Sequence, residues 1–352
     1  MKRVNLSDSA APTARWVFEC IQQLGQVVSF SDNHLMSLTT RPKRHAIHVR
    51  VGYVIATCFA LALSISAFVG RVLGPGILHP TNLNPDRTEQ TEQMLKRTGA
   101  LKEDFVVLTS DGTELRGWKV RPKAANDNWI ILFHGVSDNR TGMLGYAEFL
   151  LRHSYSVAMM DSRAHGQSTG KMATYGWKER YDTVAITDAL FSTENVHHLG
   201  ALGVSMGAAV ALQSAAVEPR IEAVVAEDPF ASLREVSYDY AGLDFSPVLG
   251  MTLFRPATII GLDELAKAGG FRPDDVSPLR AVAARNFAIL LICGTRDYRI
   301  PCRHAEQIYN AAIGPKQLWV VEGAGHASAL GQVRAQYESR VINFFEKQIP
   351  VQ

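Results

Sequence analysis

Hydrophobic and polar residues follow two different patterns along this chain, and the change falls near residue 103. Before it, the most apolar stretch is residues 51–70, twenty residues without a charge. After it, short apolar runs typical of buried strands alternate with longer segments of helical character. The runs expected as strands lie near 129–134, 156–161, 199–204, 221–226, 288–293 and 317–321. Strands that alternate with helices predict a parallel sheet covered by helices on both faces.

Two further strands are expected before these, joined as a hairpin. Residues 105–108 and 115–120 flank Ser110-Asp111-Gly112, which is a typical turn sequence. A hairpin reverses the chain, so one of its strands runs against the others. The expected fold class is therefore α/β, with a mostly parallel eight-stranded sheet that contains one antiparallel member.

The segment after residues 199–204 carries the clearest chemical signal. Gly203-Val204-Ser205-Met206-Gly207 is a G-x-S-x-G sequence between an apolar strand and a helix-forming run. Such a strand-to-helix turn strains the serine backbone and exposes its hydroxyl, while the glycines allow strand and helix to approach closely. The helix N-terminus that begins here favours developing negative charge. Ser205 is the candidate nucleophile.

Two later strand ends supply the partners that a nucleophilic serine requires. Asp297 follows one apolar run, and His326 follows the next after Gly323-Ala324-Gly325. The carboxyl ends of parallel strands are where open α/β sheets build their sites. The order serine, aspartate, histidine predicts His326 as general base and Asp297 as the residue that fixes its tautomer. A turn or helix-cap role for Asp297, with Glu322 as rival acid, is the alternative.

An oxyanion hole is expected beside the serine. Its donors are predicted to be the backbone N–H groups of Met206, which follows the nucleophile, and Val136, in the loop after residues 129–133. Gly135 would let that loop turn inward. The alternative is that His134 to Asn139 form an ordinary turn.

These segments together resemble the α/β-hydrolases of the serine-aminopeptidase-like branch, specifically membrane-anchored bacterial proteins with an N-terminal hydrophobic helix. The matching segments are Phe133-His134-Gly135, Asp161 to Ser168, the G-x-S-x-G turn, Gly294 to Asp297 and Gly325-His326. They span about residues 103–348. The chain departs from the family pattern at Ala164, where glycine is usual. The resemblance implies that Asp161 and Arg163 are scaffold, binding each other or loop backbone, and that His165 is structural.

The predicted function is hydrolysis of an ester, thioester or amide through an acyl-enzyme on Ser205, with no cofactor. The expected substrate is a small acyl compound or a short peptide, and esters are favoured because nothing identifies a pocket for an amino terminus. An acyltransferase or a cofactor-free peroxidase on the same triad is the alternative. So is a non-catalytic, membrane-tethered binding module, against which the complete triad argues.

The net charge and the cysteines further restrict the partners, disulfides and metal ligands that the sequence predicts. A net charge of +2 is too balanced to indicate a nucleic-acid partner. The four cysteines, at 20, 58, 293 and 302, fall in unlike settings, so no disulfide framework is expected. Cys302 and His304 near Asp297 resemble metal ligands, but a second ligand pair is missing from the pattern and no metal is predicted.

Residues 51–70 are long enough to span a hydrocarbon core as a helix. A buried helix of a soluble domain is the alternative, and about fifty preceding residues argue against a cleavable signal. Arg41, Lys43, Arg44 and Arg50 precede the span, whereas Arg71 alone follows it closely. The positive-inside rule then predicts a single-pass protein with a cytoplasmic N-terminus and the hydrolase domain outside, in contact with membrane lipid through this helix.

The predicted organisation has four parts. They are an N-terminal tail over 1–46, the transmembrane helix over 47–72, a linker over 73–102 and the α/β-hydrolase domain over 103–352. Residues 16–30 of the tail are an amphipathic candidate, with a poorly ordered tail as the alternative.

A cap is expected at about 228–278, because this segment is too long for a loop between two strands. Its apolar residues are Leu249, Met251, Leu253, Phe254, Ile259, Ile260 and Leu262. They predict a small helical cap that lines the space over Ser205, or, equally, side chains packed on the sheet.

Overall fold

The computed structural model describes residues 44–85, 87–242 and 247–350. The predicted amphipathic stretch over residues 16–30 lies outside these ranges. The chain divides into two units, Met1–Cys58 and Phe59–Gln352. Everything described below from residue 59 onward belongs to the second unit.

Helix α2, Arg44–Leu73, contains the predicted span. Residues Val51–Leu78 are long and apolar enough to cross a membrane, and the most apolar 18-residue window among them has none of its surface buried. A core helix of a soluble domain would bury its apolar side chains. The structure therefore disfavours the alternative of a buried core helix.

The second unit is built on one eight-stranded sheet of order β1-β2-β4-β3-β5-β6-β7-β8. The strands are β1 Leu101–Leu108, β2 Glu114–Arg121, β3 Asn128–Phe133, β4 Ser156–Met160, β5 His198–Val204, β6 Ile221–Glu227, β7 Ala288–Gly294 and β8 Lys316–Val321. Strand β2 is antiparallel to both neighbours, and the pairs from β4 to β8 are parallel. The predicted fold class, including its single antiparallel member, is confirmed.

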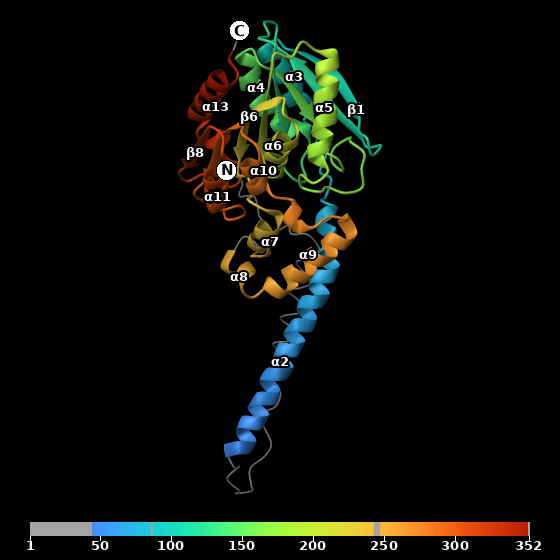
Figure 1. The fold of residues 1–352 in the computed structure, drawn as a ribbon, viewed down its shortest axis with the longest axis vertical. Coiled ribbons are helices and arrows are strands. Elements are labelled where there is room, and N and C mark those ends of the chain that lie inside the picture. The colour runs from blue at the N-terminus through green and yellow to red at the C-terminus, as the bar shows by residue number, and fades with distance from the viewer. Residues whose placement is uncertain (1–43, 86, 243–246, 351–352) are drawn as a thin grey trace, which may run out of the picture. The chain divides into compact units, whose positions relative to one another are not determined.

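Helices cover both faces of this sheet (Figure 1). One face carries α3 Thr88–Thr98, α4 Leu144–Arg152, the short α12 Ala329–Gln332 and α13 Arg334–Gln348. The other carries α5 Glu179–Thr193, α6 Met206–Val217, α10 Pro278–Ala284 and α11 Arg303–Ala311. Alternate residues of a strand point to opposite faces, so Ile130 and Leu132 join one core cluster while Ile131 and Phe133 join the other.

The segment predicted as a linker over 73–102 packs against the domain over much of its length. The 3₁₀ helix η1, Pro75–Leu78, buries Leu78 completely. Helix α3 buries Met94, and Arg97 Nε donates to Glu148 Oε1 at 2.8 Å. Apolar side chains buried in this way stabilise the attachment by about 1.5–3 kcal/mol each.

The segment between β6 and β7 is helical, as expected for a cap. It contains α7 Leu233–Ala241, α8 Pro247–Met251, α9 Arg255–Gly269 and the 3₁₀ turn η3 Pro273–Asp275, before α10. The expected positions of its apolar side chains are wrong, because Leu262 is buried but Met251, Leu253 and Ile259 are exposed to solvent. These exposed residues neither line a cavity over Ser205 nor pack on the sheet.

The expectation that the cysteines are unrelated is also corrected. Cys293 and Cys302 form a disulfide, with their Cα atoms 5.4 Å apart. The loop that leaves β7 reverses and returns Cys302 beside the end of the strand, so two settings that look unlike in the sequence are adjacent in space. The bond closes a short ring that contains Asp297.

Candidate active site

The turn between β5 and α6 has the geometry expected of a nucleophile elbow. Ser205 has φ 57° and ψ −119°, a backbone conformation that is unfavourable for any residue other than glycine. A Cβ on Gly203 would lie 2.2 Å from the carbonyl oxygen of Gly207, and one on Gly207 would lie 2.1 Å from that of Phe133. Glycine is therefore required at both positions for strand and helix to come this close.

Ser205, His326 and Asp297 lie in a continuous hydrogen-bonded row, although they come from three different strand ends. His326 Nε2 is 2.9 Å from Ser205 Oγ, and His326 Nδ1 is 2.7 Å from Asp297 Oδ2. The other oxygen of Asp297 accepts the N–H groups of Arg299 and Ile300, each at 2.9 Å. This arrangement makes Nδ1 the donor to Asp297 and leaves Nε2 to accept the serine proton.

The imidazole of His326 is mostly buried, with 15% of its side chain exposed. Burial opposes a charge on the ring, but the hydrogen bond and the negative charge of Asp297 outweigh it, and the pKa of His326 is raised above 6.5. A raised pKa makes the ring a stronger base toward the serine proton. It also means that a larger fraction of the ring is protonated near neutral pH.

A second carboxyl group faces His326, and sequence analysis missed it. Asp228, directly after β6, places Oδ2 3.9 Å from His326 Nδ1. That oxygen accepts the N–H of Ala327 at 2.7 Å, and Oδ1 accepts the N–H of Gly294 at 3.3 Å. Burial, with the nearby carboxylates of Glu227 and Asp297, raises the pKa of Asp228 to about 8. Asp228 thus ties the loop that carries His326 to the end of β7.

Glu227, beside Asp228, was also missed. It is completely buried and accepts hydrogen bonds from the hydroxyls of Tyr146 and Tyr337, both at 2.8 Å, and from the N–H of Ala329 at 3.1 Å. Burial raises its pKa despite these bonds. Its backbone oxygen accepts the N–H of Ser205 at 2.8 Å. The one sequence signal for Glu227 and Asp228 is that two acidic residues stand together at the end of a strand, just as Asp297 follows the end of another strand.

The predicted oxyanion loop lies next to the serine. A Cβ on Gly135 would lie 3.7 Å from that of Ser205, and Val136 lines the same cavity as Ser205. His134 is completely buried; its Nδ1 faces the carbonyl of Gly135 at 2.7 Å, and its Nε2 accepts the N–H of Ser162 at 3.0 Å. Burial lowers the pKa of His134 to about 4, so the ring is neutral and Nδ1 donates to this carbonyl while Nε2 accepts. Met206 is the first residue of α6.

The cavity that contains Ser205 and His326 has a volume of about 940 Å³. Its other lining residues come from the oxyanion loop, the start of α4, the segment before α3, the end of α7 and the loops that carry Asp297 and His326. Among them are Leu83, Arg87, Met143, Tyr146, Tyr240 and Arg299. Polar and apolar side chains are mixed, so the cavity has room for an acyl chain and for a polar leaving group.

The segment expected as scaffold has that role, with different partners. Asp161 accepts the backbone N–H groups of Arg140 and Gln167, whereas Arg163 pairs with Asp182 and Asp111 rather than with Asp161. His165 is completely buried. Ala164 has φ +60°, a left-handed conformation that explains why glycine is usual there.

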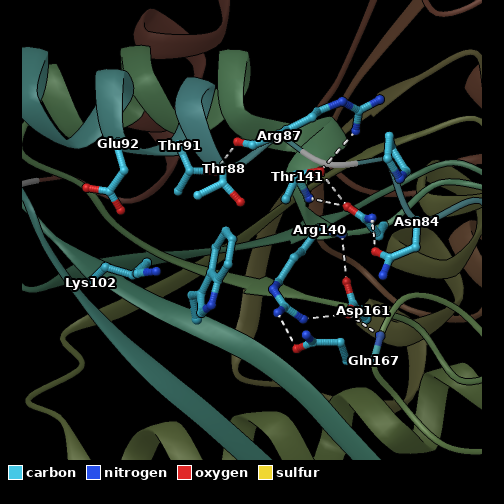
Figure 2. Close-up of a pocket in the computed structure, with 13 residues that line it drawn as sticks. Asn84, Arg87, Thr88, Thr91, Glu92, Lys102, Arg140, Thr141, Asp161 and Gln167 are labelled. Carbon is cyan, nitrogen blue, oxygen red and sulfur yellow. Dashed lines mark hydrogen bonds and ion pairs between the residues drawn. The ribbon is translucent and has the colours of Figure 1, made fainter.

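A smaller pocket of about 270 Å³ adjoins the first and shares Asn84, Pro85 and Arg87 with it. Figure 2 shows Arg140 held between Asp161 and Gln167 at its base. Lys102 and Arg140 lie 4.6 and 4.4 Å from the ring centre of Trp118. Among the charged residues that line this pocket, Arg140 pairs with Asp161, and Arg87 pairs with Asp138 of the larger cavity at 2.8 Å.

The alternative of a metal site at Cys302 and His304 does not fit the geometry. Cys302 is in the disulfide, and His304 Nε2 is bound to Asp239 Oδ2 at 2.7 Å. The ligand atoms of Asp228, Asp297 and His326 lie within 4.8 Å of one another, but the hydrogen bonds above already account for their arrangement.

Comparisons with known proteins agree with this fold. The sequence model of the family "Serine aminopeptidase, S33" matches residues 124–254. The chain is 29% identical to the uncharacterized protein YqkD of Bacillus subtilis, over 85% of this chain and 97% of that one. It is 26% identical to the uncharacterized protein YfhR of Escherichia coli K12, over 69% and 80%.

Among solved structures, the esterase Pf2001 of Pyrococcus furiosus superposes with a TM-score of 0.63 and 25% identity. The match covers 78% of this chain and 98% of the esterase. An eight-stranded mixed sheet with a serine elbow defines an α/β-hydrolase. The chain belongs to the α/β-hydrolase superfamily, and its residues 124–254 are similar to the serine aminopeptidase family.

Proposed function

We propose that the protein is a membrane-anchored serine hydrolase that cleaves esters through an acyl-enzyme on Ser205. The observation that carries this proposal is the hydrogen-bonded row from Ser205 through His326 to Asp297, opening on a cavity large enough for a substrate. Nucleophile, base and orienting acid then stand in the relation that serine hydrolysis requires.

In the first half-reaction, Ser205 Oγ attacks the ester carbonyl while its proton passes to His326 Nε2. The carbonyl oxygen becomes an oxyanion, which the N–H groups of Val136 and Met206 stabilise. The bond to the leaving alcohol then breaks, and that alcohol takes the proton from Nε2. Asp297 stabilises the imidazolium throughout.

In the second half-reaction, water attacks the acyl-enzyme and gives a proton to His326 Nε2. The acid product leaves, and Ser205 recovers its proton. Each group ends as it began, and every proton moves between substrate, water, Ser205 and His326. No step needs a cofactor.

We favour esters over thioesters and amides as substrates because the solved structure named above, which is 25% identical to this chain, is an esterase. An amino-terminal peptidase would need a buried carboxylate in the cavity to bind the substrate ammonium group. Asp138 lines the cavity but is partly exposed and pairs with Arg87 at 2.8 Å, and the carboxyl groups of Asp297 and Asp228 face His326 instead.

Helix α2 is the proposed anchor, with the catalytic unit on the non-cytoplasmic side. Its length and exposed apolar surface support insertion in a bilayer. The disulfide between Cys293 and Cys302 supports the orientation, because such bonds persist in oxidising compartments.

Covalent labelling tests the proposal. Detergent-solubilised full-length protein should be labelled by a fluorophosphonate probe and should hydrolyse p-nitrophenyl butyrate. Ser205→Ala should abolish labelling and lower turnover by several orders of magnitude. Ser192→Ala, an exposed hydroxyl on α5, is the matched control and should keep both. EDTA should leave the rate unchanged, and near-normal turnover by Ser205→Ala would refute the assignment.

A further inference from the structure

We infer that the cap rests on the bilayer beside α2, so that the Ser205 cavity receives its ester from the membrane. The surface concerned is the cap face, defined as the exposed apolar side chains Val248, Met251, Leu253 and Ile259. The inferred substrate is an amphiphilic ester dissolved in the bilayer. This inference rests on the proposed anchor and hydrolase.

The contact that fixes this placement joins α2 directly to α9. A Cβ on Gly70 would lie 2.5 Å from the carbonyl oxygen of Ala257, and one on Gly74 would lie 2.3 Å from that of Gly261. Glycines four residues apart thus let the two backbones touch, as small residues do between membrane helices. The end of α2 is held against the cap without a flexible connection.

The depth of the cap follows from this contact. The uncharged stretch 51–70 has twenty residues, which as a helix matches the hydrocarbon thickness of about 30 Å. Gly70 is its last residue, so the first turns of α9 lie at the boundary between hydrocarbon and headgroups. Arg71 follows at once and suits the headgroup region.

The cap face has the character of a surface that enters this boundary. Leu253 is 67% exposed and Val248 60%, with Met251 and Ile259 each at 39%. These residues lie on α8, on the connection to α9 and on the first turns of α9, and those first turns are next to Gly70. Apolar side chains at such a level can bury themselves about 5–10 Å into the membrane interface.

The cap face is also joined to the cavity. A Cβ on Gly250 of α8 would lie 1.7 Å from the carbonyl oxygen of Tyr238, so α8 packs directly on α7. Tyr240, at the end of α7, lines the Ser205 cavity, and so does the exposed side chain of Leu83. A molecule leaving the bilayer beside the cap face has an apolar edge to follow toward Ser205.

An exposed apolar face could also bind a second copy of this chain. The bilayer is favoured because the same face continues into α2, whose apolar side chains are exposed along its described length. A partner protein would have to cover the cap face while α2 stayed in lipid.

The test compares two substrates with one protein. Full-length protein is reconstituted in phosphatidylcholine vesicles and given either a long-chain ester dissolved in the bilayer or water-soluble p-nitrophenyl butyrate. The double variant Met251→Glu, Leu253→Glu should lower the rate on the bilayer ester at least tenfold and leave the soluble ester within twofold. Ile313→Glu, equally exposed at the amino end of β8 on the opposite sheet edge, should change neither rate.

A second variant keeps the outcome clear if the double variant folds poorly. Gly74→Val forces α2 away from Gly261 and should also slow the bilayer ester selectively. Unchanged rates on the bilayer ester in both variants would overturn the inference, and so would a dimer in detergent that the double variant splits. Failure of the unmodified protein to hydrolyse the soluble ester or to accept the fluorophosphonate would instead refute the proposed function.

Discussion

The sheet edge that carries the triad and the cap that stands beside it are built in opposite ways. At the edge, Ser205, Asp228, Asp297 and His326 each follow the end of a parallel strand. Hydrogen bonds with backbone groups hold Ser205, Asp228 and Asp297, and the carboxylate of Asp297 holds His326. In the cap, helices pack mainly on one another and on η1, α9 touches the end of α2, and large apolar side chains remain exposed. The ends of the strands fix the positions of the candidate catalytic groups. The cap helices, which tolerate substitutions better, control how a substrate reaches them.

The largest expected effect is at the elbow. Gly207→Val would push a branched side chain against the backbone of Phe133, which the sheet prevents from moving. We expect a loss of more than about 4 kcal/mol in the free energy of unfolding, or no folded protein. Gly331→Ala is the control, because a Cβ there meets open space. Thermal unfolding of the detergent-solubilised chain measures both, and equal stability would contradict the comparison.

The next effect is on the rate. Asp297→Asn keeps the shape of the side chain but presents the wrong tautomer of His326 to Ser205, so kcat should fall by about 10³–10⁴-fold. Asp263→Asn, on the exposed surface of α9, should change kcat by less than twofold. Steady-state hydrolysis of p-nitrophenyl butyrate measures this, and a loss below tenfold would indicate that Asp228 takes over.

A smaller effect concerns pH. His326 must be neutral to accept a proton, so kcat/KM should rise with pH through a midpoint above 6.5. Asp228 faces His326, Glu227 and Asp297, and its pKa is raised to about 8. Its ionisation adds a negative charge beside the imidazolium, so a further rise should follow near that pH. Asp228→Asn should remove the second rise and lower kcat/KM less than Asp297→Asn does. A profile that falls between pH 6 and 8 in stable protein would exclude the mechanism.

The smallest effect is expected in the cap. Leu253→Ser removes an exposed side chain that packs on little else, so the free energy of unfolding should change by less than about 0.5 kcal/mol. Leu262→Ser replaces a buried side chain of α9 and should lower the free energy of unfolding by about 2–5 kcal/mol. If the two variants unfolded alike, the cap face would be covered by protein and the contrast between the two regions would fail.

The sheet was predictable because its apolar runs are local in sequence and alternate with helices. Ser205, Asp297 and His326, which the structure brings together, could be proposed as a triad because each follows such a run with a recognisable turn. Asp228 and Glu227 were missed because an acid at a strand end has no motif of its own. Their partners, such as Tyr337 and Ala327, are about a hundred residues away.

Contacts between distant segments also explain the corrected predictions. The disulfide depends on a loop reversal that cannot be predicted from amino-acid composition. The packing of residues 75–98 depends on contacts with side chains of α4 and α9, which are distant in the sequence. Helical periodicity predicted the cap helices but not what their apolar residues contact. The anchor, the orientation and the catalytic roles stay predictions until the experiments above are done.

The ring closed by Cys293 and Cys302 has a consequence for how this protein can diverge. Asp297 is held inside it by two backbone N–H groups of the same ring and is joined covalently to β7 at one end. The position of the Asp297 carboxylate is therefore set largely within residues 293–302. Beyond this ring the carboxylate bonds His326, so substitutions in α11 are expected to disturb Asp297 less than substitutions in the loop that carries His326.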